Sequence, residues 1–193
     1  GICDENEVIS DPNCVLPASG EPTNTGNNMS IMLLAPFVSS LNIQSELPYL
    51  VAFDGEMIVG YTSLASDNLQ NGQTQISLWG DDTLTPELDG AIGGASISFQ
   101  LVDGNLLYDV VVPMLVNYET NGISVQPSPA TSVTLVCEQE VIVYGCTNPT
   151  ATNYNSEADQ DDGSCIELVS GCTDELALNY DANANVNDDT CQY

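Results

Sequence analysis

The chain of 193 residues contains no lysine, arginine or histidine against 28 aspartate and glutamate residues, so its formal net charge at pH 7 is −28. Because no side chain can neutralise phosphates or release their counterions, nucleic-acid binding is excluded. An anionic membrane surface repels the chain for the same reason. Carboxylates crowded into one fold also repel one another, and divalent cations taken from solution relieve that repulsion.

The same absences remove most catalytic groups, because the chain has no imidazole base, no Schiff-base lysine and no guanidinium clamp. A carboxylate pair of the glycosidase type is what remains, and Asp81 with Asp89 is the candidate pair. Clustered carboxylates without cations more often bind a metal ion. We therefore expect that the chain is not an enzyme.

Long apolar runs are also missing, since the longest, Met29 to Val38, falls short of the roughly 18 residues of a membrane-spanning helix. The first residues, Gly1 to Asp4, are typical of a mature N-terminus whose leader has been removed. The seven cysteines lack the Cys-x-x-Cys and histidine spacings of zinc sites. A disulfide framework is the better interpretation, and it places the protein outside the cell.

Two segments, Gly145 to Cys165 and Gly171 to Cys191, are copies of one motif with a period of 26 residues. Both begin with Gly-Cys-Thr and share Ala, Asn-Tyr, Ala, Asp and Cys at matching offsets. Because the cysteines are 19 residues apart in each copy, we expect Cys146 to pair with Cys165 and Cys172 with Cys191. A segment this short cannot build its own core, and a disulfide with a metal ion is the usual substitute.

Calcium is the expected cofactor, because Asp and Asn oxygens alternate in both copies and also crowd the loop from Trp79 to Gly90. The candidate ligands are Asn153, Asn155, Asp159, Asp161 and Asp162 in the first copy, Asn179, Asp181, Asn185, Asn187 and Asp188 in the second, and Asp81, Asp82 and Asp89 in the loop. The alternatives are a solvated spacer for the copies and a polar turn for the loop.

The repeated motif resembles the short calcium-binding-like repeats of secreted, surface-attached proteins of Bacteroidetes, which are loosely similar to thrombospondin type 3 repeats. Upstream, Thr25 to Ser30, Val51 to Gly55 and the Trp79-Gly80-Asp81-Asp82 sequence resemble a β-sandwich domain of the same surface proteins. The resemblance implies a place in stalks, adhesins or filaments.

The chain before the repeats is typical of an all-β protein, with β-branched and aromatic segments separated by Asp-Gly and Asn-Gly turns. The expected strands are Ser30 to Ala35, Tyr49 to Phe53, Met57 to Leu64, Thr74 to Trp79, Ser96 to Val102, Leu106 to Val116 and Ser132 to Tyr144. No segment shows a convincing helical period. We expect an N-terminal arm (1–22), a β-sandwich (23–144), two disulfide-stapled, loop-rich acidic repeats (145–165 and 171–193) and a linker (166–170).

The three remaining cysteines allow two arrangements. In the preferred one, Cys3 pairs with Cys14 across 11 residues, and Cys137, which alternates with Val133 and Leu135, points into the core as a free thiol. In the other, Cys14 pairs with Cys137, and Cys3 is left to find a partner on another chain.

The function expected from these features is that of a non-catalytic extracellular structural protein, a subunit of a calcium-stabilised surface filament or appendage. Self-association would use calcium and a strand of the arm, Cys14 to Leu16, added to a neighbour's sheet. The alternative is a monomeric adhesion or glycan-binding module of a larger surface protein. Its candidate stacking residues are Tyr49, Tyr61, Trp79, Tyr108 and Tyr118.

Overall fold

The computed structural model describes residues 11–20, 22, 25–82 and 86–193. The chain divides into two compact units, Gly1–Glu140 and Val141–Tyr193. Within the described ranges, no helix combines the length and the apolar character needed to cross a membrane.

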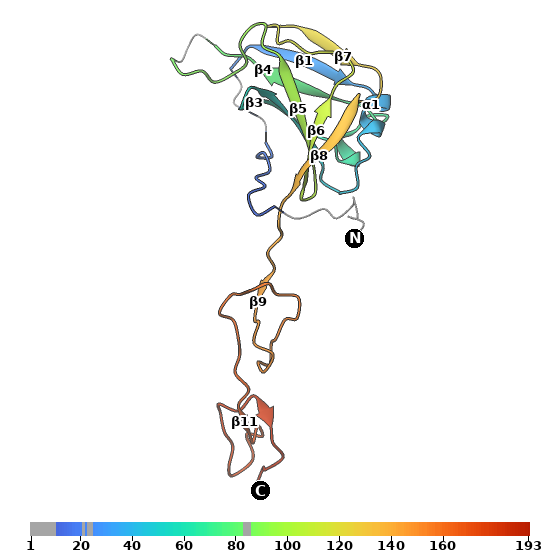
Figure 1. Ribbon diagram of the computed structural model, residues 1–193. Helices are drawn as coiled ribbons and strands as arrows, with labels where there is room; N and C mark the ends of the chain where they lie inside the picture. The colour runs from blue at the N-terminus through green and yellow to red at the C-terminus, as the bar shows by residue number, and fades with distance from the viewer. Residues whose placement is uncertain (1–10, 21, 23–24, 83–85) are drawn as a thin grey trace, which may run out of the picture. The chain divides into compact units, whose positions relative to one another are not determined.

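The first unit is built on one sheet of eight strands, so the expected all-β class is confirmed (Figure 1). The strands are β1 (Asn28–Leu33), β2 (Tyr49–Asp54), β3 (Met57–Ser63), β4 (Thr74–Trp79), β5 (Ile97–Asp103), β6 (Leu106–Val111), β7 (Ile123–Gln126) and β8 (Ser132–Glu138). Their order in the sheet is β7-β1-β4-β3-β2-β5-β6-β8. All neighbours pair antiparallel except β1 and β7, which are parallel. The hydrogen bonding therefore joins all eight strands into one sheet.

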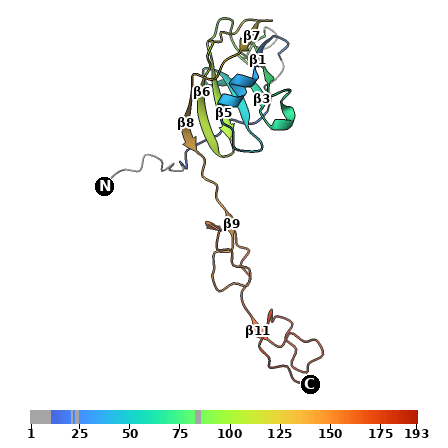
Figure 2. The same ribbon diagram turned by 90° about the vertical axis from the view of Figure 1, so that its right-hand side faces the viewer.

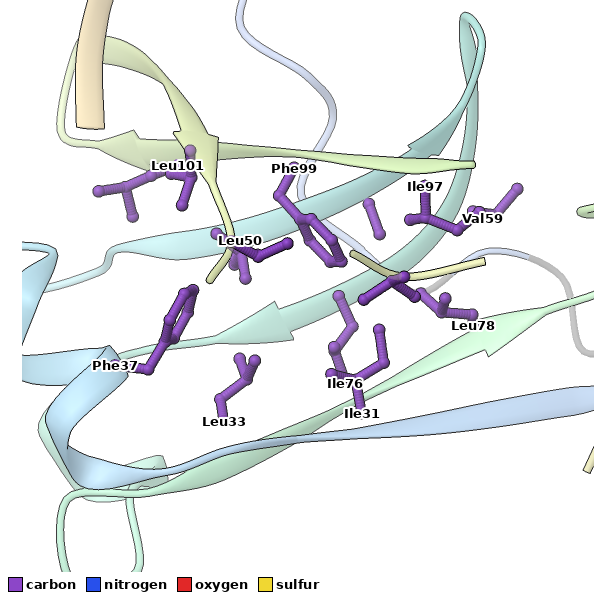
Figure 3. Close-up of a cluster of buried hydrophobic side chains, with 14 of the residues drawn as sticks. Ile31, Leu33, Phe37, Leu50, Val59, Ile76, Leu78, Ile97, Phe99 and Leu101 are labelled. Atoms are coloured by element: carbon purple, nitrogen blue, oxygen red, sulfur yellow. The ribbon is translucent and has the colours of Figure 1, made fainter. Parts of the chain in front are cut away.

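The sheet curls, so that side chains from its two halves meet in one core (Figure 3). Every second residue of β1 is buried, as are Ile76 and Leu78 of β4, and these apolar side chains face those of β2 and β5. Examples are Ile31 and Ile76 from one half and Leu50 and Leu101 from the other, all of them at most 1% exposed. The alternation of apolar and polar residues seen in the sequence is therefore the physical basis of the fold.

Sequence reasoning missed a helix and a strand of the first unit, besides the short 3-10 helix η1 (Ser66–Asn68). The helix α1 (Ala35–Ser40) has Pro36 in its first turn, buries Phe37 and Val38 in the core and lies at one end of the curled sheet (Figure 2). Six residues are under two turns and show no usable period, so no helix was expected there, and the strand expected from Ser30 to Ala35 ends two residues earlier, at Leu33. The four-residue β7 was missed because it contains only two apolar residues.

The arm is fastened to the outer face of the sheet, and the preferred pairing of Cys3 with Cys14 is wrong. Cys14 is bonded to Cys137, with 5.8 Å between their Cα atoms. Both lie in a second, smaller apolar cluster with Val102 and Leu107. Cys3 lies outside the described residues.

Alternation with Val133 and Leu135 predicted that Cys137 points into the main core, and this prediction is also wrong. The register of β8 against β6 shifts by one residue between Tyr108 paired with Leu135 and Leu107 paired with Cys137. This β-bulge places Leu135 and Cys137 on opposite faces, although they are two residues apart. The alternation rule failed because it assumes an uninterrupted ladder.

The expected strand Cys14 to Leu16 does not form either. Among its described residues, the arm makes one ladder contact, a bridge from Asp11 to Gln139, and the N–H of Asp11 donates to the carbonyl oxygen of Glu138 at 2.9 Å. Farther along, the hydroxyl of Tyr49 donates to the carbonyl oxygen of Pro17 at 2.7 Å. The described part of the arm is therefore used within its own chain.

The second unit holds the two repeats, each closed by its own disulfide, Cys146 with Cys165 and Cys172 with Cys191. These are the pairings that the equal spacing predicted. Each repeat contains one two-stranded parallel pair, β9 (Tyr144–Gly145) with β10 (Gln160–Asp161) and β11 (Ser170–Gly171) with β12 (Val186–Asn187). The rest of each repeat is loop.

Candidate functional site

The ten Asp and Asn residues proposed as metal ligands in the repeats all accept backbone N–H groups, in five equivalent pairs. Three of the pairs form local turns, in which a side-chain oxygen accepts the N–H two residues ahead at 2.9 to 3.1 Å. These pairs are Asn155 and Asp181, Asp161 and Asn187, and Asp162 and Asp188.

The other two pairs are latches between distant segments. Asn153 donates through Nδ2 to the carbonyl oxygen of Ser164 at 2.7 Å and accepts the N–H of Ile166 at 2.8 Å. Asn179 makes the same two bonds to Thr190 and Gln192, at 2.9 and 2.8 Å. Both latches hold the end of a repeat against its middle.

The other pair of latches, formed by Asp159 in the first copy and Asn185 in the second, holds the segment that enters each repeat. Asp159 accepts the N–H of Val143 at 3.0 Å, and Asn185 accepts the N–H of Val169 at 2.9 Å. A backbone hydrogen bond accompanies the side-chain bond in both copies, because the N–H of Asp159 donates to the carbonyl oxygen of Val143 and the N–H of Asn185 to that of Val169. Asn185 also donates through Nδ2 to the carbonyl oxygen of Glu167 at 2.7 Å, so what the two copies share at this position is an oxygen acceptor and not a charge.

Glycine and alanine in the motif have a packing role. A Cβ on Gly145 would lie 3.3 Å from Ala158, and one on Gly171 would lie 3.0 Å from Ala184. The entering segment thus passes close over a small residue in both copies, which explains why the motif keeps Gly before the first cysteine and Ala after the Asn-Tyr step. The first cysteines, Cys146 and Cys172, are buried at 1% and 2% exposure.

Most of the acidic residues in the repeats are exposed to solvent. Hydrogen bonds from the hydroxyl and backbone N–H of Ser164 hold the pKa of Asp162 below its ordinary value. Thr190 has the same effect on the pKa of Asp188. Within the described ranges, no three acidic or cysteine side chains converge as a metal-binding group. The expected ligands are therefore ordered by hydrogen bonds, and within the described ranges their carboxylates do not converge on one point.

In the loop from Trp79 to Gly90, the structure brings Asp81 and Asp89 together, because the N–H of Asp89 donates to Oδ1 of Asp81 at 3.2 Å. The base of the loop is closed by a bridge between Gly80 and Ala91. Asp82 is partly buried beside them. Residues 83–85 lie outside the described residues.

The base of this loop is tightly packed. A Cβ on Gly80 would collide with the hydroxyl oxygen of Tyr118, and one on Gly90 would collide with the backbone of Gly80. Tyr118 is 2% exposed. Gly80 of the Trp-Gly-Asp-Asp sequence and Gly90 at the end of the loop are therefore explained by close packing at the base of the loop, beside a buried tyrosine.

Sequence reasoning missed a buried carboxylate at the other end of the sheet. Asp103, at the end of β5, is 5% exposed and accepts the N–H groups of Gln44 and Ser45, both at 2.7 Å. The bonds fix the loop from α1 to β2. The Asp103-Gly104 turn between two strands was visible in the sequence, but nothing there pairs it with Gln44.

A hollow of about 830 Å³ lies beside this loop, between α1 and the short 3-10 helix η1 (Ser66–Asn68). Apolar side chains such as Val38 and Leu64 line it together with polar ones such as Asn42 and Ser45. The hydroxyl oxygen of Ser45 is buried, and no described residue forms a hydrogen bond with it.

The expected aromatic stacking residues do not share one surface. Tyr118 and Tyr108 belong to the main core or pack against it, and Tyr49 packs against the cluster around Cys14. Only Tyr49 and Tyr61 are neighbours, with ring centroids 5.5 Å apart. Burial and, to a lesser degree, the phenol of Tyr61 raise the pKa of Tyr49.

No protein-family model, curated protein or solved structure matches the chain.

Proposed function

We propose that the chain is a non-catalytic structural protein of the extracellular space, a subunit of a calcium-stabilised surface filament or appendage. The observation that carries the proposal is that the two repeats are copies of one self-contained module and share the same set of hydrogen bonds. Each copy has its own disulfide, its own latches and its own closing turns. Tandem modules that fold by local contacts are the usual way to build extended spacers.

The disulfides support an extracellular location. Six of the seven cysteines are joined in three bonds, which indicates an oxidising environment. Secretion to a cell surface is the setting that the resemblance to Bacteroidetes repeats implies. As part of this proposal, the two halves of the curled sheet correspond to the two facing layers of the β-sandwich domain that the same resemblance implies.

Calcium enters the proposal because of the uncompensated charge. The chain has 28 carboxylates and no cationic side chain, so bringing the acidic surfaces of several copies together requires cations from solution. The turns formed by Asp161, Asp162 and Asp188 hold exposed carboxylates at the surface of the repeats. Oxygen groups of this kind suit calcium better than magnesium, which demands a stricter octahedral geometry.

Electron microscopy and sedimentation of the full chain test the proposal. We expect filaments or higher assemblies in millimolar calcium, their loss in chelator, and little effect of magnesium at the same concentration. Calorimetry should show heat of calcium binding under the same conditions. A chain that stays monomeric and binds no calcium would contradict the proposal.

The alternative function, a monomeric adhesion or glycan-binding module, is favoured by the hollow beside α1. A mixed apolar and polar lining with a buried hydroxyl at Ser45 is typical of a site for a small polar ligand. Screening neutral oligosaccharides by NMR tests this alternative, since shifts confined to Asn42, Ser45 and Leu64 would locate a ligand there. Shifts that are absent or scattered would remove it.

A further inference from the structure

The edge of the sheet formed by β8 is open over most of its length. β8 is the last strand in the sheet order and pairs with β6 on one side. On the other side, Asp11 bonds to Glu138 and covers the C-terminal end of the edge. From Ser132 to Leu135, no strand within the described part of the chain lies on that side. An edge of this kind is a template for pairing with another strand.

The usual protection of such an edge is missing between Ser132 and Leu135. Natural edges carry charged residues, proline or a bulge that prevents pairing. The bulge and the arm protect only the C-terminal end, and the stretch 120–137 contains no acidic residue in a chain of net charge −28. The nearest carboxylate across the ladder is that of Asp109, opposite Thr134, and it accepts a hydrogen bond from Gln100 at 2.9 Å.

Apolar side chains accompany this open edge. Leu135 is 37% exposed and Val136 49%, and the strand as a whole is exposed at four of its seven positions. Pairing with another strand would remove part of this apolar surface from water and would satisfy main-chain groups at the same time.

The distribution of charge identifies the partner. A basic protein would be drawn to the acidic surfaces of the chain, whereas a second copy, itself at −28, can approach closely only where acidic groups are absent. We propose that the β8 edge pairs antiparallel with the β8 edge of a second copy, in a two-fold symmetric dimer. Such isologous pairs are the commonest closed assemblies.

This inference rests on the proposed function and names the contact through which copies associate. It differs from the calcium-dependent step, because strand pairing at an uncharged edge requires no cation. The pairing should therefore persist in chelator, and the two steps can be measured separately.

The test compares Thr134→Glu with Thr134→Gln by sedimentation equilibrium, in chelator and in a Cys3→Ser background that excludes covalent links. The two variants have the same shape and differ in charge. In an antiparallel pair of β8 edges, the two copies of residue 134 lie near the two-fold axis, where like charges repel. We expect a concentration-dependent dimer for the Gln variant and a dissociation constant about fivefold higher for the Glu variant.

A matched pair on the opposite edge serves as control. Ile123 on β7 is 77% exposed, and Ile123→Glu should dissociate the dimer no more than Ile123→Gln does. Because Asp109 lies opposite residue 134, Thr134→Glu can also weaken the fold. The fluorescence of the single tryptophan, Trp79, during urea unfolding reports such a loss. If the fold is affected, Ser132→Glu with Ser132→Gln replaces the pair, since Ser132 faces Val111.

Three outcomes overturn the inference. They are a monomer at every concentration in chelator, equal dissociation constants for the Glu and Gln variants, or dissociation by Ile123→Glu instead. If calcium still produces filaments in any of these cases, the proposed function stands and the contact lies elsewhere. If Thr134→Glu raises the dissociation constant of the dimer but calcium produces no larger assembly, the inference stands and the proposed filament is contradicted.

Discussion

Cys14 and Cys137 are joined by a disulfide bond although 123 residues separate them in the sequence. The bond is possible because the bulge in β8 turns Cys137 to the outer face of the sheet, where Cys14 packs with Val102 and Leu107. It ties the start of the described chain to the last strand of the sheet. The free thiol expected in the core is thereby replaced by a structural cross-link.

Replacing both cysteines, as Cys14→Ala with Cys137→Ala, should lower the free energy of unfolding of the sheet by about 2 to 4 kcal/mol, because the unfolded chain regains the entropy of a long loop. Urea unfolding followed by the fluorescence of Trp79 measures the change. The pair Cys146→Ala with Cys165→Ala is the control, since it removes a bond from the other unit and should leave this transition in place. An unchanged midpoint for the first pair would contradict the prediction.

The second prediction concerns Cys3, the one cysteine left after three bonds are assigned among seven residues. In an oxidising medium a leftover cysteine finds a partner on another chain. We expect a dimer band on a denaturing gel without reductant, and its loss in Cys3→Ser. A monomer that takes up one maleimide per chain would show that the thiol stays free.

The third prediction concerns the Asn153 latch. Asn153→Ala removes its bonds to Ser164 and Ile166 and should destabilise the first repeat by about 1 to 2 kcal/mol. Hydrogen exchange at the Ile166 amide is the measurement. Asn153→Asp keeps the acceptor for Ile166 but places a carboxylate oxygen against the carbonyl oxygen of Ser164, which Nδ2 now approaches to 2.7 Å, so it should not restore the stability.

A control comes from the other latch, the one that holds the entering segment, where the second repeat has Asn185 and the first has Asp159. Asp159→Asn should therefore leave the exchange rate of the Val143 amide nearly unchanged. If Asp159→Asn costs as much as Asn153→Ala, the charge of Asp159 has a role that its hydrogen bond does not explain.

The fourth prediction is a pH dependence of the repeats. In the folded chain, hydrogen bonds from Ser164 and Thr190 lower the pKa values of Asp162 and Asp188 from their ordinary value of 3.8. The unfolded chain thus binds more protons over this range, and stability falls as pH drops below the ordinary value and through the folded pKa values. Calorimetric unfolding between neutral pH and pH 2 should show this loss. Asp162→Asn with Asp188→Asn should flatten it.

Several features could be predicted from residues alone because their causes are local. Apolar alternation over six or seven residues located most strands, as in β4, and the pairing of Cys146 with Cys165 followed from a spacing that occurs twice. The role of the Asp and Asn residues was read only in part, since their pattern is shared by hydrogen-bonded turns and by calcium loops. The structure shows the turns, and calcium remains a proposal.

The sequence by itself determined the all-β class, the absence of cationic chemistry and the extent of the two repeats, because these follow from composition and from patterns shorter than about thirty residues. Only the tertiary structure decided the partner of Cys14, the bonds of Asp103 to Gln44 and Ser45, and the open edge of β8. Each of these joins segments distant in the chain. A one-residue bulge or the order of strands in a sheet changes which distant side chains meet, and neither leaves a local signal in the residues involved.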